Sequence, residues 1–388
     1  MDDKGIDRRQ FLKAGAVIGG GAIIGGGMLS LANAAGVEQK AATGAAHRLP
    51  FSNETGIGGY WDNSLPPVLR IKSGDTVSVE TGYHLMNKIS PGTDLEFWMK
   101  EYKAHMAKFP DTTFAPEPNT GVEAKPKPPN HTTLTGPIYV EEAESGDVLQ
   151  IEILKIVPYP DGFNIHPHPP FMKGGVLAAD YPDMQGRVKW WRADSNNEIE
   201  FLPGVKIPLR PFPGTLGVQL PERGRFPNIP PGKHAGNLDM KELVAGTVLY
   251  VPVWVKGALV MTGDSHLLQG DGEVNVSALE GAFKDQTMRI TVRKDLKQKI
   301  DGWPLVSTPT HWIALGVHMD AYKACQMAIR KSIHFLKNHY GMPDREAYTF
   351  CSMAVDLRVS QIVDYANGIH AMIPKSSFAD PSRNALLL

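Results

Sequence analysis

Two short segments of the chain concentrate the residue types that can perform chemistry. Residues 230–239 and 263–273 together hold two His, three Asp, one Glu, one Asn and one Gln, with five Gly among them. A metal site needs such nitrogen and oxygen donors on a backbone that lets them converge. Asp264 and His266 are alternate residues, so on a strand their side chains share one face. Histidine and carboxylate donors without a thiolate predict a divalent metal ion, Zn²⁺ first and Ca²⁺ as an alternative.

The same residues also fit simpler explanations. Gly-Asp-Gly is a common turn sequence, and an Asp in a turn usually accepts hydrogen bonds from backbone N–H groups. A structural Ca²⁺ loop at 271–273 in a sugar-binding β-sandwich is a second alternative. A turn would be the better explanation for any single Asp or His, whereas the density of the whole cluster favours a functional site.

Strands are expected to position this cluster. A pattern of strand, turn ending in Gly-Asp, and strand surrounds Gly74 and Gly146, and Gly246 has a similar setting. Such repeats are common in β-sandwiches and barrels. The apolar runs 248–253 and 258–261 are expected to pair as a hairpin. That hairpin would bring the two polar segments to one end of a sheet.

The C-terminal part has a different, helical pattern. Apolar residues recur three and four apart between Tyr322 and Leu336, and Gly341 follows as a helix stop. A second helix is predicted from Asp344, so the range 319–356 is expected to be helical. The predicted fold class is α+β, mainly β, with packed sandwich- or barrel-like sheets and a helical element near the C-terminus. Residues 376–388 are expected to form a tail.

Composition supports this class and narrows the partners. The 388 residues include 39 Gly and 31 Pro, without the tripeptide period of collagen. A hydrophobic content of 42% and a net charge of −1 exclude wholesale disorder and leave no basic excess for binding nucleic acid. We therefore expect no nucleic-acid partner, and we also expect a homo-oligomer.

Several other reactive residue types are expected to be structural. Cys325 and Cys351 are predicted to lie in the core rather than to act as nucleophiles, and a disulfide between them is left open. Three histidines in Pro-rich loops are expected at the surface or behind the site: His131, His166 and His168. The pair Trp190-Trp191 is expected in the core, with a pocket wall as the alternative. Residues 86–130, polar and rich in Pro, are predicted to be an insertion or lid.

The two polar segments resemble the hallmark motifs of the acetamidase/formamidase family. Residues 234–239 match its His-Gly-Gly-Asn-x-Asp element with Ala235 in place of one Gly, and residues 263–273 match its Gly-Asp-x-His-x-x-Gln-Gly-Asp-Gly-Glu element without a break. Weaker similarities extend the resemblance from about residue 60 to residue 375. The resemblance implies hydrolysis of short aliphatic amides, such as formamide and acetamide, to the carboxylic acid and ammonia.

Amide hydrolysis requires a strong nucleophile, a charge sink for the oxyanion and a proton for the departing ammonia. The predicted metal ligands are Asp239, Asp264 and His266. Glu273 is predicted to be the general acid/base, with His234 as a proton relay or further ligand. Asn237 and Gln269 are expected to bind the substrate or the oxyanion. The alternative is an extracytoplasmic protein that binds small amides or urea, which would need neither a metal nor an acid/base Glu.

Residues 1–34 resemble a twin-arginine export signal. Arg8 and Arg9 precede an uncharged stretch, and Ala32-Asn33-Ala34 has the form of a cleavage site. A retained membrane anchor is the alternative. We expect cleavage and a periplasmic protein without membrane contact, whose catalytic unit spans residues 35–375. Replacing both arginines by lysine is expected to keep the precursor in the cytoplasm, which cell fractionation would test.

Overall fold

The computed structural model describes residues 44–108, 131–166, 175–177, 179–180 and 186–384. The predicted export signal, the stretch 109–130 of the predicted insertion, and His168 lie outside these residues. None of the helices in the described part combines the length and hydropathy that a bilayer-spanning helix needs.

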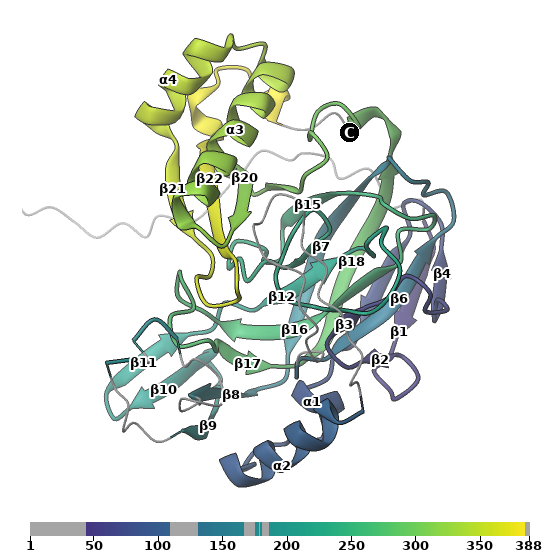
Figure 1. Cartoon of the computed structure of the whole chain (residues 1–388), viewed down its shortest axis with the longest axis vertical. Helices are drawn as coiled ribbons and strands as arrows, with labels where there is room; N and C mark the ends of the chain where they lie inside the picture. Colours follow the sequence, from purple (N-terminus) through teal and green to yellow (C-terminus); the bar gives the residue numbers. More distant parts are fainter. Residues whose placement is uncertain (1–43, 109–130, 167–174, 178, 181–185, 385–388) are drawn as a thin grey trace, which may run out of the picture. The chain divides into compact units, whose positions relative to one another are not determined.

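Two nine-stranded sheets form most of the described chain (Figure 1). The first sheet has the order β1 (Ala46–Leu49), β5 (Thr76–Val79), β18 (Phe283–Arg293), β7 (Val148–Pro158), β15 (Thr247–Pro252), β19 (Leu305–Ser307), β20 (His311–His318), β22 (Asn367–Pro374), β21 (Asp356–Val359). The second has the order β14 (Ala235–Asn237), β12 (Phe212–Gly217), β16 (Val260–Leu268), β17 (Leu279–Gly281), β8 (Asp161–His166), β9 (Arg187–Arg192). Its strand β16 also pairs with β6 (Leu134–Val140), which pairs with β2 (Gly56–Ile57) and β4 (Leu69–Ile71). Two small sheets join β10 (Glu198–Leu202) to β11 (Val205–Pro208) and β3 (Tyr60–Trp61) to β13 (Phe226–Pro227).

The two large sheets pack against each other through one apolar core. Val77 and Ile151 from the first sheet and Ile138 and Val260 from the second are fully buried in the same cluster. Burial of such a side chain contributes about 1.5–3 kcal/mol relative to exposure. The predicted class, mainly β with packed sheets, is confirmed.

The repeated Gly-Asp turns carry the chain from one sheet to the other. The turn at Gly74 joins β4 to β5, and the turn at Gly146 joins β6 to β7. Both glycines have a positive φ, of 90° and 88°, which glycine adopts without strain. The following residue caps each turn: Asp75 accepts a hydrogen bond of 2.9 Å from the Lys72 N–H, and Asp147 accepts one of 3.0 Å from the Glu144 N–H.

The expected hairpin between 248–253 and 258–261 is wrong. Strand β15 pairs with β7 and β19 in the first sheet, whereas β16 pairs with β12, β17 and β6 in the second. Both strands are buried along nearly their whole length. Without an alternation of buried and exposed residues, the sequence does not indicate which partner a strand takes.

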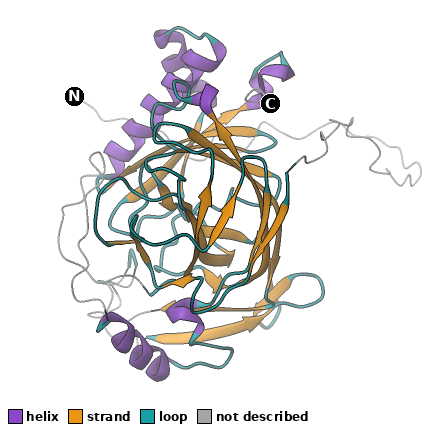
Figure 2. Cartoon of the chain, turned by 90° about the vertical axis from the view of Figure 1, so that its right-hand side faces the viewer, coloured by secondary structure: helices purple, strands orange, loops and turns teal. Residues whose placement is uncertain are grey.

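Two helices near the C-terminus pack on one end of the first sheet (Figures 1 and 2). They are α3 (Ala321–Tyr340), which contacts β20 and β22, and α4 (Asp344–Ala354). Asp320 caps α3 by accepting a hydrogen bond from the Lys323 N–H, and Gly341 ends it with φ of 71°. Cys325 and Cys351 are unbonded and lie in or against the apolar cluster beneath these helices. The predicted helical element is thus present.

Two shorter helical segments lie between residues 84 and 106. Helix α2 (Leu95–Met106) lies within the predicted insertion and buries Trp98 completely. The four-residue α1 (His84–Asn87) is a left-handed turn, with φ of 56–60° at Leu85, Met86 and Asn87. The described residues also form three short 3₁₀ turns: Lys294–Leu296, Lys375–Ser377 and Pro381–Asn384.

Candidate active site

Strand β16 places Asp264 and His266 on one face, as the alternation predicts. The Nε2 atom of His266 lies 3.8 Å from Oδ1 of Asp264 and 3.3 Å from Oε2 of Glu280, its cross-strand neighbour on β17. The Oδ1 atom of Asp239, just after β14, lies 3.9 Å from the same nitrogen. Gly214 on β12 closes the other side, because a Cβ atom there would come within 2.7 Å of the His266 ring. The three predicted metal ligands therefore face one point.

The amide of Gln269 orients the His266 ring. Its Nε2 donates 2.9 Å hydrogen bonds to two backbone carbonyls, those of Asp239 and Ser360. Because both partners can only accept, the amide oxygen must face Nδ1 of His266, 2.8 Å away, and accept its N–H. The other ring nitrogen, Nε2, then faces the carboxylates, the orientation common in metal-binding histidines.

Asn237 ties the carboxylates together. Its Nδ2 donates to Oδ2 of Asp239 at 2.6 Å and to Oδ2 of Asp364 at 2.8 Å. Its Oδ1 accepts a 2.6 Å hydrogen bond from the hydroxyl of Thr215 on β12. Both amide hydrogens are thus used within the protein. Asn237 and Gln269 hold other site residues, and substrate binding by either of them stays a prediction.

A second histidine reaches the cluster from the left-handed turn α1. The Nε2 atom of His84 lies 3.2 Å from Oδ1 of Asp264 and 3.3 Å from Oε2 of Glu280. The turn is held by the Leu85 N–H, which donates to the His131 carbonyl at 2.7 Å, and by the buried Leu85 side chain. The His131 ring lies behind His84, with centroids 4.9 Å apart. Burial, followed by the proximity of His84, lowers the pKa of His131 to about 3, so this imidazole is neutral.

The cluster contains more acidic groups than basic ones. Within the described residues, the ion pairs of its buried carboxylates are made to His84 and His266. The carboxylates are Asp239, Asp264, Glu273, Glu280 and Asp364. This imbalance is large for a buried site, because a buried charge requires a partner.

The carboxyl groups of the cluster differ in the direction of their pKa shifts. Burial opposes charge on His84 and His266, but contacts with Asp264 and Glu280 outweigh it and raise both histidine pKa values, that of His84 to about 9. The same contacts outweigh burial and lower the pKa values of Asp264, to about 2, and of Glu280. Burial raises the pKa of the remaining carboxyls. They are Asp239 and Glu273, well above their usual range, and Asp364, to about 6.

Backbone strain coincides with the cluster. Asp239, Asp264 and Glu273 have φ of 47°, 49° and 46°, a left-handed region that non-glycine residues rarely occupy. Each such residue costs on the order of 1–3 kcal/mol, and such outliers gather at functional sites. The strain supports a functional interpretation over the turn-cap alternative.

Glu273 connects the cluster to a large cavity. One of its carboxylate oxygens lies within 4.8 Å of ligand atoms of His266 and Asp239, and it accepts no hydrogen bond from the described residues. The cavity has a volume of about 660 Å³, and Glu273 and Gln269 line it. Trp191 also lines this cavity, whereas Trp190 packs against Phe163 in an apolar cluster, so the tryptophan pair divides between wall and core.

Other predicted residues lie away from this point. His234 packs edge-on against Trp61 at 5.1 Å, and in the described chain it belongs to none of the groups of converging ligand atoms. Its role as relay or ligand stays a prediction. Asp271 pairs with Arg358 at 2.6 Å and with Lys241 at 3.0 Å, which disfavours a Ca²⁺ loop at 271–273. His166 is half-buried at the cavity wall.

The donor set fits a divalent metal ion. Oδ1 of Asp239 and Oε2 of Glu280 are buried without a hydrogen-bond partner among the described residues, and both lie near Nε2 of His266. A divalent cation would satisfy these oxygens and offset the excess negative charge. Two neighbouring groups of three residues could each hold such an ion: Asp239, His266 and Glu273, and His84, Asp264 and Glu280.

Three residues of the cluster are not predicted from the sequence: His84, Glu280 and Asp364. Glu280 carried a signal, because it is a single charged residue in the apolar stretch 278–283. His84 and Asp364 lie 180 and 100 residues from Asp264 in the chain, and nothing local marks them.

Comparisons with known proteins identify the family of this chain. A model of the acetamidase/formamidase family matches residues 127–224 and 223–380. The formamidase of Methylophilus methylotrophus is 24% identical over 413 residues, covering 85% of this chain and 91% of that protein. The acetamidase of Mycolicibacterium smegmatis is 26% identical over 291 residues, covering 55% and 71%. The crystal structure of an acetamidase from Bacillus halodurans has a TM-score of 0.70 at 28% identity, covering 85% of this chain and 98% of that one.

The fold and site thus define a β-rich protein with a buried carboxylate and histidine centre. The chain belongs to the acetamidase/formamidase family. The resemblance stated from the motifs is confirmed, and so is the expectation of an amidase.

Proposed function

We propose that this protein hydrolyses carboxamides, including short aliphatic amides, to the carboxylic acid and ammonia with the help of a divalent metal ion. The observation that carries the proposal is the position of Glu273. It is a carboxylate without a hydrogen-bond donor among the described residues, 7% exposed, between the His266 cluster and the cavity. The names of the formamidase and acetamidase relatives support the same reaction.

The residues that would hold the metal are Asp239, Asp264, His266 and Glu280, with His84 beside them. When bound, a divalent ion supplies a charge sink for the oxyanion and lowers the pKa of water. Gln269 keeps the Nδ1 hydrogen of His266 turned away from the carboxylates, and Asn237 fixes Asp239 and Asp364. These two amides act as positioning groups.

Glu273 would move the proton that the reaction transfers. Burial raises its pKa, so it can hold a proton near neutral pH and release it to the departing nitrogen. It would first take that proton from the attacking water. Water and amide then give acid and ammonia, with no net change at Glu273.

A protein that only binds amides is the competing function, and the family match favours the hydrolase. The deciding experiment measures ammonia release from formamide, acetamide, propionamide and urea by the purified protein. The panel is run before and after chelation, with the metal content determined in parallel. Ammonia release that chelation abolishes and added metal restores is expected. Release unchanged in metal-free protein would exclude the metal, and no release from any amide would exclude the hydrolase.

A further inference from the structure

The cavity at Glu273 is much larger than the amides named above. Formamide and acetamide have three and four non-hydrogen atoms and occupy roughly 100 Å³, on the scale of about 30 Å³ per liquid water. The cavity of about 660 Å³ lies in the range that holds drug-sized ligands, about 300–1,000 Å³. A short amide would leave most of it filled with water.

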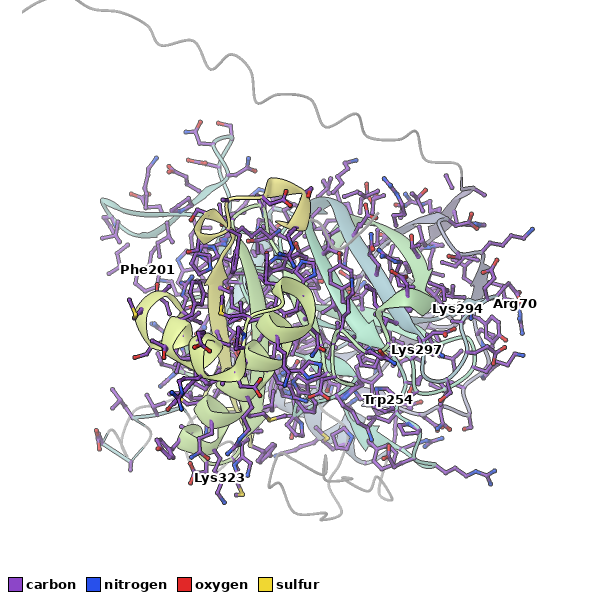
Figure 3. The ribbon with its side chains drawn as sticks, turned by 90° about the horizontal axis from the view of Figure 1, so that it is seen from above. Arg70, Phe201, Trp254, Lys294, Lys297 and Lys323 are labelled. Carbon is purple, nitrogen blue, oxygen red and sulfur yellow. The ribbon has the colours of Figure 1, made fainter. Side chains whose placement is uncertain are left out.

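One wall of the cavity, formed by β9, β10 and β11, carries aromatic and aliphatic side chains beside the polar lining residues Arg187 and His166. The rings of Trp191 on β9 and Phe201 on β10 stack with centroids 5.5 Å apart and an interplanar angle of 14°, and the Trp191 indole N–H donates to the Phe201 carbonyl at 3.2 Å. Ile199 and Ile207 belong to the same small sheet, β10 and β11, and also line the cavity. Figure 3 labels Phe201 on the left of the view, the side on which Figure 1 shows β10 and β11.

The apolar lining extends from this wall towards Glu273. Leu268 and Leu279 continue the apolar lining from β16 and β17 towards Gln269 and Glu273. A ligand that lies along this lining therefore meets carboxylate chemistry at one end and an aromatic wall at the other. Such a gradient orients an amide whose acyl group is apolar, with its carboxamide at Glu273.

We infer that the site is built for primary amides with a bulky apolar acyl group, of the aryl-alkanoic type, in preference to formamide or acetamide. The inference rests on the proposed amidase function and specifies its substrate class. Packing of the substrate ring against the stacked pair Trp191 and Phe201 and against Ile207 would hold the carboxamide in place, so the gain is expected in kcat/KM.

The test compares phenylacetamide with acetamide by ammonia release from the metal-loaded wild-type protein. Discrimination by one buried methylene is about 10–200-fold, so we expect kcat/KM for phenylacetamide to exceed that for acetamide by at least about tenfold. A kcat/KM for acetamide equal to or above that for phenylacetamide overturns the inference and leaves the proposed function standing. If the protein hydrolyses neither amide, the proposed amidase function itself is wrong.

Two single substitutions locate the preference. Phe201→Ala removes part of the aromatic wall, and we expect the phenylacetamide-to-acetamide ratio of kcat/KM to fall at least about threefold. Phe97→Ala is the matched control, because Phe97 on α2 has a similar exposure, 42% against 37%, and does not line the cavity. The control should keep the wild-type ratio. Phe201→Leu repeats the measurement if the alanine variant does not fold. An unchanged ratio in a folded Phe201 variant shows that the ring binds elsewhere and overturns the assignment.

Discussion

Two groups of His, Asp and Glu in this protein contain the same residue types but balance their charge differently. Around His266, the buried carboxylates have only histidines as ion-pair partners within the described chain. In the other group, formed by Glu242, Asp271 and His370, the guanidinium of Arg358 binds Glu242 at 2.8 Å and Asp271 at 2.6 Å. Lys241 adds a contact of 3.0 Å to Asp271.

The pKa values of Glu242 and Asp239, one carboxyl from each group, shift in opposite directions. Burial alone would raise the pKa of Glu242, but His370 and Arg358 outweigh it and lower the value. The pKa of Asp239 is raised instead, by burial and by the nearby carboxylates Glu273 and Asp364. Three converging ligand atoms are therefore a poor guide to a metal site. A guanidinium already neutralises one group, whereas the other still needs a cation.

The largest effect is expected from Asp264→Asn compared with Asp271→Asn. Asparagine tolerates the left-handed backbone at residue 264, so the fold should survive. We expect Asp264→Asn to lose its metal and its amide hydrolysis together, measured by elemental analysis and ammonia release. Asp271→Asn should keep both. Full metal content in the Asp264 variant would contradict the assignment of the site.

Glu273→Gln separates proton transfer from metal binding. The change keeps the volume of the side chain but removes its ability to move a proton. General acid/base catalysis contributes about 10²–10⁴-fold, so kcat should fall by that factor with metal content retained. Loss of the metal as well would make Glu273 a ligand. A near-normal kcat in folded, metal-loaded protein would shift the proton-transfer role to another group.

The uncompensated charge predicts a pH effect on the metal-free protein. His84 has a folded pKa of about 9 against 6.5 for the ordinary side chain. Its stabilising contribution is therefore fully present below pH 6.5 and is lost as the pH rises through 9. The melting temperature of chelated protein should fall over this range, and His84→Gln should reduce the fall. Metal-loaded protein should show less of it, because the cation would offset the charge of Asp264 and Glu280 that raises the pKa of His84. A flat profile in chelated wild-type protein would contradict this electrostatic description.

The smallest effect is expected in the compensated group. Arg358→Met removes hydrogen bonds to Glu242 and Asp271, and such bonds to charged groups contribute about 1.5–3 kcal/mol to stability. Urea unfolding should show a loss of about that size, with the metal content unchanged. Arg70→Met is the control: it breaks the exposed pair with Glu141, worth at most about 1 kcal/mol. Metal loss in Arg358→Met would mean that the two groups are not independent.

The sequence predicted the site best where local geometry was sufficient. The Asp-x-His alternation on β16 predicted that Asp264 and His266 lie together, and they do so although Asp264 has a left-handed φ of 49°. Asp271 and Glu273 look equivalent in the motif and both line the cavity, yet Asp271 pairs with Arg358 whereas Glu273 lies beside His266 and Asp239. The loop turns between them through Gly272, at φ of 94°. Only tertiary structure separates these two side chains.

Long-range pairing limited the prediction of the fold. The packed sheets and the C-terminal helices followed from apolar runs and turn residues, whereas the partners of β15 and β16 did not. His84 enters the site through three consecutive left-handed residues, Leu85 to Asn87, which no propensity would predict. Contacts with the 131–133 segment hold that turn.

The loop between β21 and β22, which lies beside β16 and β17 in Figure 1, has a consequence for the order of assembly. Gly272 bridges to Gln361, and Asp364 hydrogen-bonds Asn237. The centre therefore joins residues from position 84 to position 364. Contacts so distant in sequence close late and slow the folding of β-rich chains. During synthesis the centre cannot be complete until residue 364 has left the ribosome, so a shortened chain cannot carry a finished site.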